Sequence, residues 1–140
     1  VNRIRIGAGT NLQDGTIVHG NHDRAGDYRE TGGGMPAIIG DNVVVGHQAM
    51  LHACTLEDGA FVGMAAVVMD QAVVASGAMV AAGALVTPRK TVPGGQLWGG
   101  RPARFMRPLS AAELADIAYQ AGHYRKLAKH HLEARAALRG

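Results

Sequence analysis

The chain has 140 residues, which is enough for one domain with a sizeable core. Its 20 glycines and 4% aromatic residues argue against a helical bundle or a β-sandwich, whose cores normally contain more large side chains. A net charge of +3 without a run of basic residues argues against nucleic-acid binding. No apolar stretch is as long as about 18 residues, the length that a membrane-spanning helix needs.

The single cysteine and the first residue of the sequence indicate where the protein is located and whether residues precede Val1. Cys54 excludes an internal disulfide, is compatible with a reducing compartment, and is expected to pack in the core. The sequence begins at Val1 without a methionine, and no signal peptide is visible. We therefore expect a cytoplasmic protein, and we expect that residues preceding Val1 are missing from this sequence.

Branched aliphatic residues recur every six positions, a spacing that suits neither one face of a helix nor a half-buried strand. The first run is followed by a polar, glycine-rich segment, residues 20–36, which we interpret as an inserted loop. The pattern then returns with one step of five, between Leu51 and Leu56. The repeat consists of Ile6, Leu12, Val18, Ile39, Val45, Leu51, Leu56, Val62, Val68, Val74, Val80 and Val86.

A six-residue repeat is typical of an all-β solenoid in which each coil turns three corners and directs one aliphatic side chain inward from each face. Grouped in threes, the repeat residues make coils of triangular cross-section, and equivalent positions stack as parallel strands about 4.8 Å apart. The predicted β-helix covers residues 1–92, with the loop 20–36 inserted.

An irregular exit strap is expected over residues 93–109, because that segment is rich in proline and glycine. A helix is then predicted over residues 110–138, beginning at a capping box of Ser110 and Glu113. Its apolar face, which includes Ile117, Leu127 and Leu132, is expected to cover the side of the β-helix or a neighbouring copy.

Two histidines occupy matching positions of neighbouring coils. His19 follows Val18 and His52 follows Leu51, so both are expected at the same outward position of the third face, one above the other. Both can then reach one metal ion, because zinc–imidazole bonds are about 2.0–2.1 Å long. His47 lies on the second face and points elsewhere, so a second copy is needed to supply it. This predicts a cyclic assembly, and three copies suit a triangular prism.

Three segments together resemble the gamma-class carbonic anhydrase family: VNRIRIGAGTNLQDGTIVHG, IIGDNVVVGHQAMLHACTLEDGAFVGM and GGQLWGGRPARFMRPLS. The motifs G-T-N-L-Q-D-G-x-x-x-H and G-H-x-x-x-x-H are the specific part, since many acyltransferases share the hexapeptide period. The resemblance implies a left-handed parallel β-helix with a C-terminal α-helix, assembled as a homotrimer. It also implies a zinc ion between subunits, bound by His19 and His52 of one chain and His47 of the next.

The same resemblance implies roles for the residues around the metal ion. Gln13 and Asn11 match a glutamine and an asparagine beside the metal-bound solvent, and Asp14 matches an aspartate that holds neighbouring subunits and groups in position. The implied reaction is the reversible hydration of CO2 to bicarbonate by a zinc-bound hydroxide; iron or cobalt fits the same ligands. A proton must also leave the site, and the candidates for its transfer are His22, Asp23, Asp27 and Glu30.

Other interpretations stay open. The histidines can be surface imidazoles, Gln13 and Asn11 a polar ladder between coils, and Tyr124 a core residue rather than part of the site. The chain can also be a non-catalytic structural subunit, as relatives in the mitochondrial respiratory complex I of plants are, which would place it on the matrix side of a membrane complex. The segment QLWGGRPARFMR is close to those relatives. A hexapeptide acyltransferase ranks last, because those enzymes usually depend on one histidine without this paired register.

Overall fold

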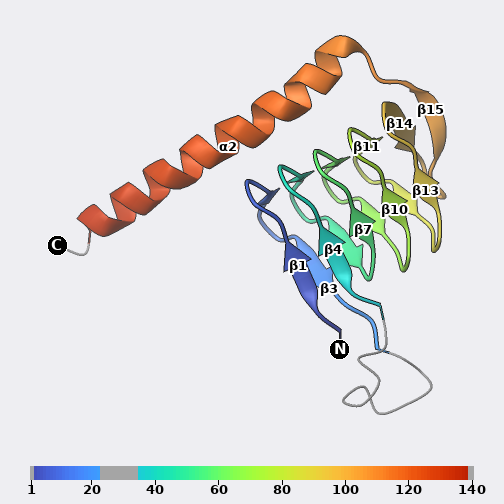
Figure 1. The fold of residues 1–140 in the computed structure, drawn as a ribbon, viewed down its shortest axis with the longest axis horizontal. Coiled ribbons are helices and arrows are strands. Elements are labelled where there is room, and N and C mark those ends of the chain that lie inside the picture. The colour runs from blue at the N-terminus through green and yellow to red at the C-terminus, as the bar shows by residue number, and fades with distance from the viewer. Residues whose placement is uncertain (1, 23–34, 139–140) are drawn as a thin grey trace.

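The computed structural model describes residues 2–22 and 35–138, and it is a left-handed parallel β-helix followed by one long helix (Figure 1). The first face stacks β1 (Ile4–Ile6), β4 (Ala37–Ile39), β7 (Thr55–Leu56), β10 (Val73–Val74) and β13 (Thr91–Val92). The second face stacks β2 (Asn11–Leu12), β5 (Val44–Val45), β8 (Phe61–Val62), β11 (Met79–Val80), β14 (Gln96–Gly99) and β15 (Arg104–Pro108). The third face stacks β3 (Ile17–His19), β6 (Met50–His52), β9 (Val67–Val68) and β12 (Leu85–Val86).

The core is a column of small and branched side chains, as the repeat predicts. Inward residues of successive coils are paired in register, for example Leu12 with Val45 and Val45 with Val62. From Ile39 to Val86 every repeat residue is buried, and alanines such as Ala60 and Ala66 fill the space near the corners. Burying each valine or leucine stabilises the fold by about 1.5–3 kcal/mol, so the stacked coils hold the outward positions in fixed register.

The second corner joins the second face to the third, over residues 13–16, 46–49, 63–66 and 81–84. Here the coils approach so closely that a side chain does not fit at two glycines. A Cβ on Gly46 would lie 2.7 Å from the backbone nitrogen of Met64, and one on Gly63 would lie 2.5 Å from that of Ala82. The bare backbone at Gly46 therefore places His47 directly against the next coil.

The exit strap is not irregular, which corrects the prediction. The six-residue step continues past Val86 to Val92, which is fully buried, and to Trp98, which packs against the core and pairs with Val80. Strand β14 extends the second face, and β15 folds back antiparallel to it. Gly94 and Gly95 form a corner of the coil, and Gly100 and Pro102 lie in the turn between β14 and β15, so proline and glycine do not end the repeat here.

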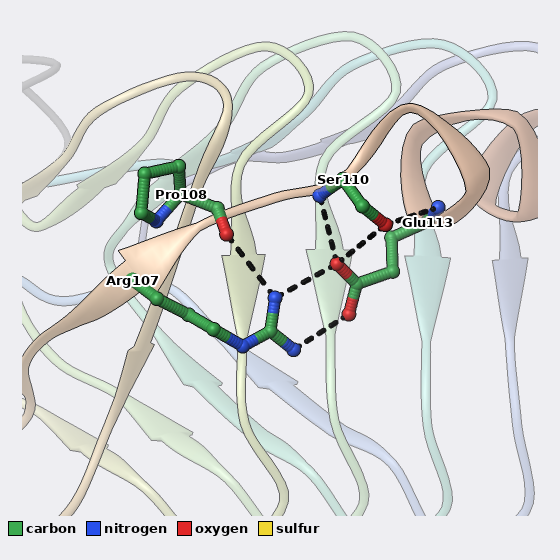
Figure 2. A network of polar contacts seen from close by, with 4 residues as sticks. All are labelled: Arg107, Pro108, Ser110 and Glu113. Atoms are coloured by element: carbon green, nitrogen blue, oxygen red, sulfur yellow. Dashed lines mark hydrogen bonds and ion pairs between the residues drawn. The ribbon is translucent and has the colours of Figure 1, made fainter.

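Helix α2 (Ala111–Ala137) begins at the predicted capping box. The Ser110 side chain accepts a hydrogen bond from the Glu113 backbone, and the Glu113 side chain accepts one from the Ser110 backbone. Figure 2 shows that Arg107 of β15 adds a bidentate ion pair to the same carboxylate, at 2.7 and 2.8 Å. The strap and the helix are thereby joined at a fixed angle.

The helix runs from β15 back along the coils towards β1 and beyond it (Figure 1). Only its first half packs on the β-helix: Ile117 and Ala121 are buried, and the helix contacts β2 and β5. Leu127 and Leu132 are 38% and 66% exposed, so the predicted apolar face does not cover the prism along its whole length. No helix in residues 2–22 and 35–138 is both long and apolar enough to span a membrane.

Candidate functional site

The third corner joins the third face to the first, and His19 and His52 lie at its entrance. His19 ends β3 and His52 ends β6, and the two residues are paired in the register of these strands. Their rings stack with centroids 5.1 Å apart and planes inclined by 15°. The predicted register is confirmed, because the six-residue repeat places both histidines one residue after an inward side chain.

A carboxylate from the next coil holds His52. The Nδ1 atom of His52 lies 2.5 Å from an oxygen of Asp70, and the other oxygen of Asp70 accepts a hydrogen bond of 2.6 Å from the Asn21 side-chain amide. Burial alone would raise the pKa of Asp70, but the hydrogen bonds from His52 and Asn21 lower it below its ordinary value. Asp70 is therefore ionised at neutral pH and faces the imidazole as a pure acceptor.

The remaining predicted residues gather at the second corner. His47 directly follows the corner glycine Gly46, and its Nδ1 atom lies 3.8 Å from an oxygen of Asp14 in the preceding coil. Gln13 and Asn11 flank the inward Leu12, and the Gln13 amide donates a 3.3 Å hydrogen bond to the Asn11 oxygen. The Asn11 side-chain nitrogen is buried and has no hydrogen-bond partner in the structure.

A cavity of about 450 Å³ opens beside this second corner, between the second face and helix α2. Gln13 and His47 line it from the coils, and Tyr124 lines it from the helix. Tyr124 is half-buried at this wall rather than a core residue, which corrects the expectation that it packs in the core. The second corner and the helix thus offer the imidazole of His47, the amide of Gln13 and the phenol of Tyr124 to one open cavity.

The candidate ligands therefore form two separate groups within one chain. In residues 2–22 and 35–138, no three side chains of histidine, cysteine, aspartate or glutamate are placed to bind one metal ion. The third corner offers two imidazoles and the second corner offers one, which together form the donor set of a catalytic zinc site. The chemistry of the donors fits zinc, but a single chain does not assemble them.

The remaining candidates are three acidic residues, two histidines and one cysteine. Asp23, Asp27 and Glu30 fall outside the described residues, whereas His22 is exposed beside Asn21. His123 lies on the helix, stacked on Tyr119 and in edge contact with Tyr124. Cys54 is buried, as expected, and burial raises the pKa of its thiol to about 12, so it is neither a nucleophile nor a metal ligand at neutral pH.

Sequence reasoning missed Asp70 and Asn21. The signal was present, because Asp70 lies in the next coil, one position past the residue stacked on His52. Counting one coil onward from His52 leads to the residue before Asp70, so the repeat brings Asp70 near the histidine without predicting their contact. Asn21 gives a weaker signal, since it belongs to the segment interpreted as a loop and its contact with Asp70 spans 49 positions.

Proteins of similar sequence occur in a plant and in an archaeon. No protein-family model matches the chain. The mitochondrial gamma carbonic anhydrase 2 of Arabidopsis thaliana is 48% identical over 94% of this chain, which covers 45% of that relative. A probable carbonic anhydrase of Methanocaldococcus jannaschii is 41% identical over 92% of this chain, which covers 74% of that relative. The chain thus spans about half the length of the plant relative and about three quarters of the archaeal one.

Solved structures agree on the architecture. A hexapeptide transferase family protein of Anaplasma phagocytophilum superposes with a TM-score of 0.77 at 42% identity, over 89% of this chain and 67% of that one. The coils and the two histidine corners thus define a hexapeptide-repeat protein of the left-handed β-helix class. Within that class, the chain belongs to the gamma-class carbonic anhydrase family.

Proposed function

We propose that the protein catalyses the reversible hydration of CO2 to bicarbonate at a zinc site shared between two subunits of a homotrimer. The observation that carries this proposal is the division of the ligands: two imidazoles at the third corner and one at the second, on a chain of the gamma carbonic anhydrase family. A neighbouring copy that sets its second corner against the third corner of this chain completes the set.

His19 and His52 would hold the ion from one chain, and His47 from the next. Zinc bound by three neutral imidazoles supplies an activated water at neutral pH, and iron or cobalt fits the same donors. Gln13 would orient a group in the cavity by its amide, and its position beside His47 in the lining supports this role. The Asn11 nitrogen, which is buried without a partner, would offer a second hydrogen-bond donor next to Gln13.

Asp14 and the proton-transfer groups act around this centre. Asp14 lies 3.8 Å from His47 and is exposed, so it is free to contact a neighbouring subunit as well. Among the proposed proton carriers His22, Asp23, Asp27 and Glu30, His22 is the described one and lies next to Asn21, itself bonded to Asp70. An exposed imidazole at that position can pass a proton to bulk water.

The decisive experiment measures CO2 hydration and metal content on the same preparation of the full-length protein. We expect about one zinc ion per chain, activity that is lost on chelation, and recovery when zinc is restored. Zinc-replete protein without activity would contradict the enzymatic proposal. It would support the second candidate, a non-catalytic structural subunit of a larger assembly.

Two points remain, the location of the protein in the cell and the possibility that it is a hexapeptide acyltransferase. We propose a cytoplasmic location, with the mitochondrial matrix as the alternative that the plant relative suggests. The similarity to a hexapeptide transferase family protein makes acetyl transfer from coenzyme A worth assaying in parallel. Transfer activity in zinc-free protein would favour that third candidate over the other two.

A further inference from the structure

We infer that Asp70, held by Asn21, is a positioning residue that fixes His52 with its hydrogen on Nδ1 and so presents Nε2 as the ligand atom. This inference rests on the proposed function, because it concerns how the chain prepares one ligand for the metal ion. It assigns a role to two residues outside the ligand set, and it specifies which nitrogen of His52 faces the ion.

The two short contacts of Asp70 determine the tautomer. An ionised carboxylate only accepts hydrogen bonds, so the Nδ1 atom of His52 at 2.5 Å must carry the hydrogen. A neutral imidazole with hydrogen on Nδ1 has its lone pair on Nε2, the atom left free to bind metal. Ligand histidines commonly donate their second nitrogen to a carboxylate in this way, which sets the ring orientation and raises its basicity.

Asn21 is itself fixed in the orientation that this arrangement needs. Its side-chain oxygen accepts a 2.8 Å hydrogen bond from the His22 backbone, so its amide nitrogen is the atom that faces Asp70. Its backbone exchanges two hydrogen bonds with Met35, at 2.8 and 3.2 Å. Both oxygens of Asp70 are therefore engaged by side chains whose positions the coil determines.

If Asp70 only supported the coil, we would expect its side chain to bind backbone groups of a neighbouring coil. Other acidic residues at the corners bind the backbone of a neighbouring coil: Asp41 accepts from Ala8, and Glu57 accepts from Ser76. The side-chain oxygens of Asp70 instead accept from His52 and Asn21. The contacts of Asp70 thus point to the candidate ligand rather than to the support of a coil.

The first test uses zinc-free wild-type protein, so it does not depend on catalysis. Long-range ¹H–¹⁵N spectra recorded at about pH 8, where imidazoles are largely neutral, report the tautomer of each histidine. The His52 signals are assigned by their absence in His52→Gln. We expect hydrogen on Nδ1 of His52, and hydrogen on Nε2 would overturn the inference.

The second test measures zinc affinity by competition with a chromophoric chelator. We expect Asp70→Ala to weaken zinc binding by about 10–100-fold, with a smaller loss for Asp70→Asn, whose amide oxygen still accepts from Nδ1. Asn21→Ala should weaken binding less than Asp70→Ala. Asp116→Asn removes the same charge from the helix, where Asp116 contacts Gln120, and should leave zinc affinity unchanged.

The two tests separate this inference from the proposed function. Zinc affinity in Asp70→Ala equal to that of wild type would overturn the inference and leave the enzymatic proposal standing. A wild-type protein that binds no zinc would refute the shared site, and the tautomer spectrum would still decide the role of Asp70. If Asp70→Ala does not fold, as a thermal melt would show, Asp70→Asn and the wild-type spectrum give the result.

Discussion

The two corners that hold the histidines differ in how firmly each imidazole is held. At the third corner, His52 and Asp70 are 2.5 Å apart, and their side chains are 33% and 24% exposed. At the second corner, His47 and Asp14 are 3.8 Å apart, with side-chain exposures of 46% and 102%. The chain orients one candidate ligand of the third corner, His52, internally, whereas it leaves His47 more exposed.

This difference teaches how a shared site can be prepared before the subunits meet. The third corner receives a carboxylate from the coil above and an amide from the coil below, so His52 is held by contacts within one chain. The second corner has only an exposed carboxylate beside its imidazole, and an exposed pair of this kind contributes about 0–1 kcal/mol. Assembly is then expected to fix His47, while His52 is fixed already.

The largest expected effect is the loss of zinc from His52→Ala. Removing this ligand also removes the one imidazole that Asp70 orients, so we expect zinc binding to fall below detection by elemental analysis of dialysed protein. His130→Ala, on the exposed part of the helix, is the matched control and should keep its zinc. Near-full zinc occupancy in His52→Ala would refute the site at the third corner.

A mixing experiment tests whether the second corner of one subunit can complete the third corner of another. His47→Ala and His52→Ala should each lack zinc and activity when pure, because each lacks one ligand of every shared site. When the two variants are unfolded together and reassembled as trimers, about a quarter of the interfaces combine an intact second corner with an intact third corner. We expect zinc and activity to return to about that fraction of the wild-type level.

The control for mixing is each variant reassembled alone, which should recover nothing. Mixtures that stay inactive although they form trimers would contradict a site shared between subunits. Full zinc binding by one pure variant would contradict it equally.

A smaller effect sharpens the contrast between the two carboxylates. Asp14→Ala should lower zinc affinity by at most about fivefold, because a pair 3.8 Å apart and exposed to water contributes little. Asp70→Ala, measured with the same chelator, should lose clearly more. Equal losses in the two variants would show that both corners orient their histidines to the same degree.

The smallest effect concerns the junction between the strap and the helix, far from either corner. The Arg107 guanidinium and the Ser110 backbone and hydroxyl lower the pKa of Glu113 to about 2. Because the folded pKa is depressed, the stabilisation is present above the ordinary glutamate value and is lost as the pH falls towards about 2. The difference in melting temperature between wild type and Glu113→Gln should therefore narrow over that range.

The matched control for this junction is Glu133→Gln, which removes a weaker, exposed pair with Lys129 at 3.9 Å. Its melting temperature should differ little from that of wild type at any pH. A Glu113→Gln difference that is unchanged at low pH would show that the ion pair does not stabilise the junction.

Much of the fold could be predicted from the spacing of aliphatic residues, because each inward side chain fixes the register of its neighbours. The stacking of His19 on His52 follows from that register alone. The continuation of the coil through Val92 and Trp98 was missed, although the six-residue step persists there, because proline and glycine were interpreted as the end of the repeat.

The polar contacts were harder to predict than the coil. The pairing of His52 with Asp70 depends on side-chain direction at a corner, which a six-residue period does not encode. The exposure of Leu127 and Leu132 depends on where the helix lies relative to the coils, and a helical period does not encode that placement. The six-residue spacing predicts which residues stack on one another, but it does not predict which neighbouring side chains they bind.

The paired backbone hydrogen bonds between Asn21 and Met35 bear on how the protein tolerates insertions and deletions. They bring the two ends of the intervening segment to a single point, so insertions or deletions between these residues leave the coil on either side undisturbed. The positions of His19, Asn21 and His52 are therefore expected not to depend on the number of residues between Asn21 and Met35. Changing that number is expected to leave the third corner intact.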